Sequence, residues 1–262
     1  MHGRIDSARE AFEQARGGGW FRPSKTVAVF EFGRNAREKK QIAGALRNHR
    51  DNAEALLSRE FLRLAPVAQN LAAGTLATVG NSTLTATSYV GISASATLSL
   101  GGDEALEGIA NAGTITLGGI LTTGTTSYTL GGAIDGVGSL VKAGAGTLTL
   151  TSLTTHTGGT TVNAGNLLLS GAGDHLADAG SLTVNGGTFD LGTLAETVGT
   201  ARLTGGTIGN GTLTATTYAF EAGTVSAVLA GGSATKTTSG TLTLAGIDRP
   251  FTTTRADVER TA

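Results

Sequence analysis

Histidine and carboxylate side chains are the main candidates for chemistry in this 262-residue chain, and they are few. There is no cysteine, so the chain has neither a thiolate nucleophile nor a disulfide. Asp174 and His175, with Asp178 nearby, are residue types that bind metals or act as general acids and bases. They follow the sequence Gly171-Ala-Gly173, so we favour a turn over a site here. None of the four histidines lies in a His-Glu-x-x-His zinc pattern: His2, His49, His156 and His175.

A second group of candidates is acidic, namely Asp103, Glu104 and Glu107. Carboxylates of this kind bind calcium, but the spacing lacks the Asp-x-Asp-x-Asp-Gly order of a calcium loop. The Gly-Gly-x-Gly-x-Asp repeat of calcium-binding β-rolls is also absent. We therefore expect a solvated loop at this point.

Basic residues are rare between residues 66 and 246, where Lys142, Arg202 and Lys236 are the only three. Lys142 and Lys236 each stand four residues before a Gly-Thr-Leu-Thr-Leu sequence, which indicates a repeated structural role. We expect both lysines to cap carbonyl groups at a corner of the chain. Glycine motifs for phosphate or dinucleotide binding are missing. The sequence therefore predicts no catalytic, cofactor-binding or metal-binding residue and favours a protein that is not an enzyme.

The stretch from Gly138 to Leu169 shows which elements carry these residues. Apolar residues fall at every second position, as in strands with one buried face, and glycines separate the alternating segments. Three strands and three corners in about thirty residues predict one coil of a parallel β-solenoid. A meander of hairpins gives a similar pattern in one copy. The expected strands are 139–142, 147–151 and 160–163, the last continuing into 166–169.

Repetition along the chain favours the solenoid over the meander. Gly186-Gly-Thr-Phe189 recurs 19 residues later as Gly205-Gly-Thr-Ile208. A longer match joins Thr83–Tyr89 to Thr212–Tyr218. The spacing of the copies is irregular, which predicts loops between coils. At about 20–25 residues per coil, residues 70–246 would form about seven to nine coils and a rod of about 35–45 Å.

Composition divides the chain near Pro66. Residues 1–65 hold 13 of the 19 basic residues but only 6 of the 41 glycines. We expect a charged, mainly helical segment over 1–65, the repeat region over 66–246, and an irregular or truncated tail over 247–262. The first segment has a basic stretch that we interpret as a solvated helix face, with nucleic-acid binding as the alternative: Arg34, Arg37, Lys39, Lys40, Arg47 and Arg50.

The central block also resembles a known family. Leu140-Val-Lys142-x-Gly144-x-Gly146-Thr-Leu-Thr-Leu150, followed by Thr157-Gly-Gly-Thr-Thr-Val162-Asn-Ala-Gly165, is similar to the autotransporter-associated β-strand repeat. This repeat occurs in the passenger regions of bacterial autotransporters and related surface proteins. The family usually has an aromatic residue where this chain has His156, so we expect altered packing at that corner and the same fold. The resemblance implies a right-handed parallel β-helix in a cell-surface or secreted protein.

These observations predict a stiff, non-catalytic stalk of an adhesin-type passenger, with an unidentified surface or host ligand and no nucleic acid as partner. The resemblance implies a signal peptide upstream and an outer-membrane translocator downstream. We expect neither within this chain, because the N-terminus lacks the apolar core of a signal peptide, so the chain is expected to be a fragment. Two alternatives stay open: a carbohydrate-acting β-helix enzyme and a threonine-ladder binder such as an ice-binding surface.

Overall fold

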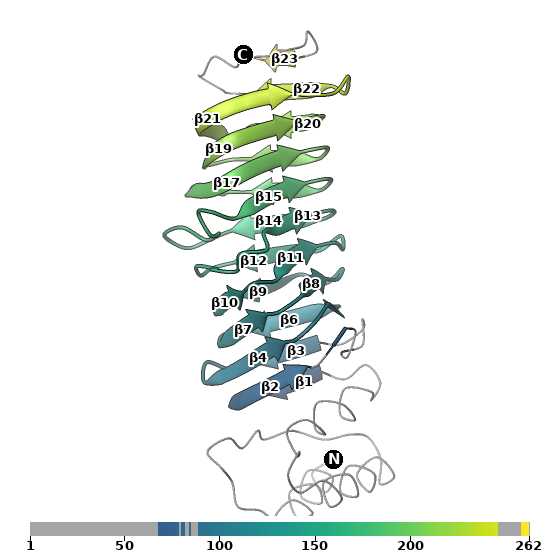
Figure 1. Cartoon of the computed structure of the whole chain (residues 1–262), viewed down its shortest axis with the longest axis vertical. Helices are drawn as coiled ribbons and strands as arrows, with labels where there is room; N and C mark the ends of the chain where they lie inside the picture. The colour runs from purple at the N-terminus through teal and green to yellow at the C-terminus, as the bar shows by residue number, and fades with distance from the viewer. Residues whose placement is uncertain (1–67, 79, 82–83, 85–88, 246–257, 262) are drawn as a thin grey trace, which may run out of the picture.

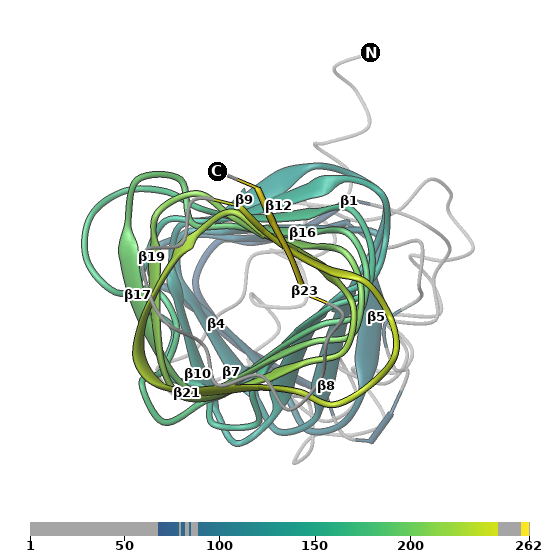
Figure 2. The same cartoon turned by 90° about the horizontal axis from the view of Figure 1, so that it is seen from above.

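The computed structural model describes residues 68–78, 80–81, 84, 89–245 and 258–261, and in this part the chain winds into a parallel β-solenoid of about nine coils. The coils stack along one axis (Figure 1) and form a closed ring when seen from above (Figure 2). The predicted all-β parallel solenoid is confirmed. The expected helical segment over 1–65 lies outside the described residues, and the right-handed winding stays a prediction.

Strands that lie above one another in successive coils form three sheets. The eleven-stranded sheet contains β1 (Ala68–Leu71), β3 (Tyr89–Ile92), β6 (Gly108–Asn111), β9 (Tyr128–Leu130), β12 (Thr147–Leu150), β14 (Asn166–Leu169), β16 (Thr188–Asp190), β18 (Thr207–Gly209), β20 (Gly223–Val225), β22 (Leu242–Ala245) and β23 (Val258–Thr261). The four-stranded sheet contains β2 (Gly74–Thr78), β4 (Ala96–Leu100), β7 (Thr114–Leu117) and β10 (Ala133–Gly136). The eight-stranded sheet contains β5 (Glu104–Leu106), β8 (Ile120–Thr123), β11 (Ser139–Lys142), β13 (Thr160–Val162), β15 (Ser181–Val184), β17 (Ala195–Leu203), β19 (Thr212–Phe220) and β21 (Val228–Lys236).

The predicted strands of the central block agree with β11, β12, β13 and β14 to within one residue at their ends. Strand β23 falls inside the stretch that we expected to be an irregular tail, and it pairs in parallel with β22.

The length of a coil follows from the strand register. Phe189 pairs with Ile208, so the two Gly-Gly-Thr copies occupy equivalent positions in neighbouring coils and their spacing is one coil length. The length also varies along the chain. Side chains that hydrogen-bond across neighbouring coils are separated by 22 residues for Asn163 and Asn185. The separation is only 17 residues where Thr238 contacts the Glu221 carbonyl. Several coils are therefore shorter than the range expected from the sequence.

The core of the solenoid is a column of inward-facing aliphatic side chains. In β12 and β14 the buried positions alternate with half-buried ones, so Leu148 and Leu150 lie against Leu167 and Leu169 of the next coil. Each buried Leu removes apolar surface from water, at about 25 cal/mol per Å². Because the same position in the next coil is again apolar, every coil extends one continuous core.

The shape of a coil changes along the axis. The four-stranded sheet ends at β10, and the next coil meets it through an isolated bridge between Ile134 and Thr154. Beyond β15 the eight-stranded sheet has strands of nine residues, β17, β19 and β21. In β19 the inward positions are Leu213 and Ala215 and then Tyr218 and Phe220, so the alternation shifts by one residue in the middle. This shift bends the strand, and one strand then covers what two strands cover in the earlier coils.

Candidate functional site

Of the acidic group near residue 103, Glu104 is built into the wall, so the expectation of a solvated loop was wrong for this residue, whereas Asp103 is exposed. Glu104 begins β5 and is 2% exposed, and its Oε2 accepts the Leu84 amide at 2.9 Å. Asp103 Oδ1 accepts the Ile120 amide at 2.8 Å. These carboxylates thus connect successive coils, because backbone amides at corners need acceptors.

Glu107 extends this pattern to the next corner. Its Oε1 accepts the amides of Thr125 and Thr126, both at 3.1 Å, together with both hydroxyl groups. Hydrogen bonds from the two threonine hydroxyls, the Thr125 hydroxyl first, lower the pKa of Glu107.

Lys142 and Lys236 are buried lysines that point into the solenoid, at the ends of β11 and β21. Lys142 Nζ donates to the carbonyl oxygens of Gly124, at 3.5 Å, and Gly144. Lys236 Nζ donates to Glu221 O at 3.4 Å and to Thr238 O. Burial lowers the pKa of Lys142. The prediction that the two lysines cap corner carbonyls is confirmed.

His156 occupies the corner where the family usually has an aromatic residue. The ring is 2% exposed, and its Nε2 lies 3.2 Å from Gly159 O and 3.1 Å from Thr160 Oγ1. Nδ1 is buried without a hydrogen-bond partner, and burial lowers the pKa of the ring. The ring therefore fills the corner and ties it to the first residue of β13, as a structural group.

The cluster of Asp174, His175 and Asp178 lies in the segment between β14 and β15, and the structure adds Glu196 to it. Glu196 is 1% exposed, and its carboxylate accepts the amides of His175 at 2.9 Å and Leu176 at 2.6 Å. Asp174 hydrogen-bonds to both Glu196 and Asp178. Burial first, and then the hydrogen bond to Asp174, raise the pKa of Glu196 to about 9.

Sequence analysis did not identify Glu196, although the alternation of residues around it contains a signal of burial. Glu196 shares the inward phase of its strand with Val198, and Glu104 shares it with Leu106. A carboxylate in the apolar phase of an alternating segment indicates a buried acceptor. Both glutamates accept the amide of a leucine that lies 20 residues earlier.

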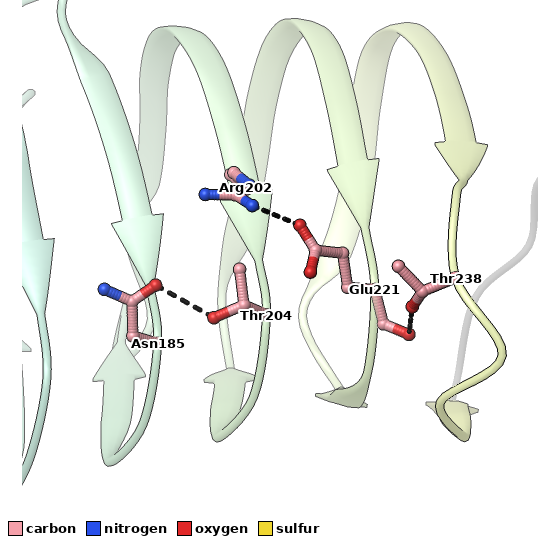
Figure 3. A network of polar contacts seen from close by, with 5 residues as sticks. All are labelled: Asn185, Arg202, Thr204, Glu221 and Thr238. Atoms are coloured by element: carbon pink, nitrogen blue, oxygen red, sulfur yellow. Dashed lines mark hydrogen bonds and ion pairs between the residues drawn. The ribbon is translucent and has the colours of Figure 1, made fainter.

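A polar network follows the outer edge of the eight-stranded sheet (Figure 3). Thr204 Oγ1 donates to Asn185 Oδ1 at 2.8 Å, and Thr238 Oγ1 donates to Glu221 O at 2.9 Å. Arg202 forms an ion pair with Glu221 of the next coil. These groups bond to one another across coils, so the network links neighbouring coils.

Four threonines, one in each of four successive strands, form one regular outward rank. In the eleven-stranded sheet Thr188 pairs with Thr207, Thr207 with Thr224 and Thr224 with Thr243. The adjacent rank is irregular, because Leu168, Asp190 and Gly209 follow one another there. A flat threonine face needs parallel ranks, so the arrangement disfavours the ice-binding alternative.

Other candidates gain no site from the structure. Within the described ranges, no group of three or more His, Asp or Glu side chains is arranged to hold a metal ion. No helix in the same residues is long and apolar enough to cross a membrane. His2, His49 and the basic stretch of 34–50 lie outside the described residues. The longer repeat copies are not equivalent, since Tyr89 is exposed on the eleven-stranded sheet and Tyr218 is buried on the eight-stranded one.

Comparison with known proteins supports the resemblance stated above. Residues 140–169 match the passenger-associated-transport-repeat family. The chain is 36% identical over 119 residues to the "Adhesin BmaC autotransporter" of Brucella suis biovar 1 (strain 1330). The match covers 45% of this chain and 3% of that adhesin. No solved structure matches the chain. Residues 140–169 are therefore similar to the repeats of autotransporter passengers.

Proposed function

We propose that this chain is a segment of the stalk of an adhesin-type autotransporter passenger, located at the cell surface or outside the cell in the full-length protein. The observation that supports it best is the uninterrupted parallel pairing from β1 to β23 in the eleven-stranded sheet. Every coil bonds to the next through backbone hydrogen bonds, so bending the rod would break several of them. The name of the Brucella relative and the repeat family agree with this role.

The proposed stalk is non-catalytic and needs no cofactor. Its buried ionisable groups accept or donate hydrogen bonds within the wall and do not face a substrate. Glu196 in particular is 1% exposed and uses both carboxylate oxygens for backbone amides, which argues against the carbohydrate-acting enzyme. The surface or host ligand would then bind elsewhere in the full-length protein, and the stalk would set its distance from the cell.

Removing one coil in register tests this proposal. Phe189 and Ile208 occupy equivalent positions, so deletion of residues 190–208 joins Phe189 to Gly209 with the alternation intact. We expect a folded rod that is shorter by about 4.8 Å, one strand spacing. The control deletes 190–207, which shifts the register by one residue, turns the apolar set outward and should unfold the coils nearby. Small-angle scattering measures the length, and circular dichroism measures the strand content.

Cell adhesion separates a stalk from a binding surface. In the full-length protein, the in-register deletion should leave adhesion to the ligand within about twofold of the parent, since only the reach changes. Loss of adhesion by a variant that is displayed and folded would contradict the stalk and locate a ligand site in these coils.

A further inference from the structure

Residues 170–180 leave the wall of the solenoid between β14 and β15, where earlier coils have a strand of the four-stranded sheet. The inner part of this loop is buried, with His175 0% and Leu176 3% exposed. The outer part, Ser170 to Gly173, is exposed. Packing of Leu176 in the core and a small number of polar contacts therefore hold this loop to the solenoid.

The main contact is the carboxyl group of Glu196 on β17. Glu196 Oε2 accepts the His175 amide at 2.9 Å, and Oε1 accepts the Leu176 amide at 2.6 Å. The Asp174 carboxyl hydrogen-bonds to this same group, while its Oδ1 lies 3.4 Å from the Thr197 amide. Two carboxyl groups can form a hydrogen bond with each other only if one of them carries a proton.

We propose that the 170–180 loop is a pH-sensitive latch, closed in mild acid by a proton shared between Asp174 and Glu196 and released as the pH rises. The latch stands on its own geometry and does not depend on the proposed stalk function. Loss of the shared proton places two negative charges together in a buried site, and outward movement of the loop separates them.

The direction of the pH dependence follows from proton linkage. The pKa of Glu196 is raised to about 9 in the closed loop, and an open, solvated glutamate titrates near its ordinary value of about 4.3. Between these two pKa values the closed loop holds a proton that the open loop has released, so the latch weakens as the pH rises from about 4.3 to about 9. The pKa of Asp174 is lowered, because its hydrogen bonds to Glu196 and Asp178 outweigh burial, and closure therefore also weakens in strong acid.

Other ionisable groups also lie near the latch. Asp178 lies on the loop, and its hydrogen bond to Asp174 raises its pKa. Nδ1 of His175 lies 3.1 Å from Gly173 O, and Nε2 lies 2.8 Å from Ser170 O. The coil below presents Thr154, which donates to His175 O, and beyond it His156. In the coil above, Leu213 pairs with Glu196.

Amide hydrogen exchange of the 262-residue chain tests the latch. We expect the protection factors of the His175 and Leu176 amides to fall by at least about tenfold between pH 5 and pH 8, the effect of one released proton over about one pH unit. The amides of β12, which belong to the neighbouring wall, should stay protected. Unchanged protection at His175 and Leu176 over this range would overturn the proposal.

Two variants and a control identify the groups. Glu196→Gln stays neutral at every pH, so the pH dependence should disappear even if overall protection is lower. Asp174→Asn keeps Glu196 and its two amides but removes the second carboxyl, so the pH dependence should become smaller while the part that comes from burial of Glu196 remains. Asp190→Asn changes a carboxylate that accepts the Gly192 amide at 2.8 Å, away from the loop, and should leave the pH dependence intact. A tenfold change that persists in folded Glu196→Gln, or a pH dependence that is undiminished in Asp174→Asn, would show that another group drives it.

Discussion

The two ends of the solenoid close the same ring in different ways. Up to β10 each described coil uses short strands on separate sheets, and tight glycine turns join the four-stranded side to the eight-stranded side. From β17 onward, one nine-residue strand covers both sides and bends in the middle. Coils of the same length occur in both parts, since Tyr89 pairs with Gly108 and Gly223 pairs with Leu242. A corner can therefore be a turn or a bend, as long as the inward positions keep facing the core.

The coils between these two parts show what the change requires. Where the four-stranded sheet stops, the backbone loses its ladder partners on that side. Thr154, His156 and His175 are buried there, and Lys142 and Glu196 lie just before and after. Buried backbone groups need partners, and these side chains provide them. The polar residues thus mark the transition between two kinds of corner.

The largest expected effect separates a turn corner from a bend corner. A Cβ added at Gly138 would lie 2.0 Å from Gly119 O of the coil below, too close for any carbon. We expect Gly138→Ala to lower the free energy of unfolding by about 1–3 kcal/mol, the usual cost of overpacking. Thr216, in the middle of β19, is exposed, so Thr216→Ala should change stability by less than about 0.5 kcal/mol. Urea unfolding of the two variants measures the difference, and equal losses would remove the distinction.

The sequence predicts those features of the structure that follow from a regular spacing of residues. Alternation in Thr147–Leu150 and the recurrence of Gly186 as Gly205 identify strands and coil length, because both are local patterns. Glu104 was wrongly predicted to be exposed, because a cluster of acidic residues usually lies in solvent. Its position in the alternation of β5, which is the buried one, contains the opposite signal. The partnership of Asp174 with Glu196 joins one coil to the next, so it depends on stacking that no local pattern encodes.

A smaller effect distinguishes the corner at His156 from the 170–180 loop. Burial holds the pKa of His156 below its ordinary value of about 6.5, so this corner is stable above that pH and weakens as the pH falls. The latch at Glu196 has the opposite sign. We expect the protection factors of the Thr157 and Gly158 amides to fall from pH 7.5 to pH 5. His156→Phe should remove this pH dependence at the cost of one hydrogen bond, about 0.5–1.5 kcal/mol. A corner that instead becomes more protected in acid would show that protonated His156 is stabilised there.

The smallest expected effect concerns the outer face of the nine-residue strands. Of the three basic residues between positions 66 and 246, two are buried, and only Arg202 reaches the surface, where it pairs with Glu221. The side chain of Arg202 is 53% exposed, so water and salt screen the pair. A double-mutant cycle with Arg202→Ala and Glu221→Ala should give a coupling free energy of about 0.2–1 kcal/mol that decreases in 1 M salt. The bend coils would then be held by backbone ladders and the core. A coupling free energy well above this range would instead mean that a charge pair takes over part of the role that buried carboxylates have in the first coils.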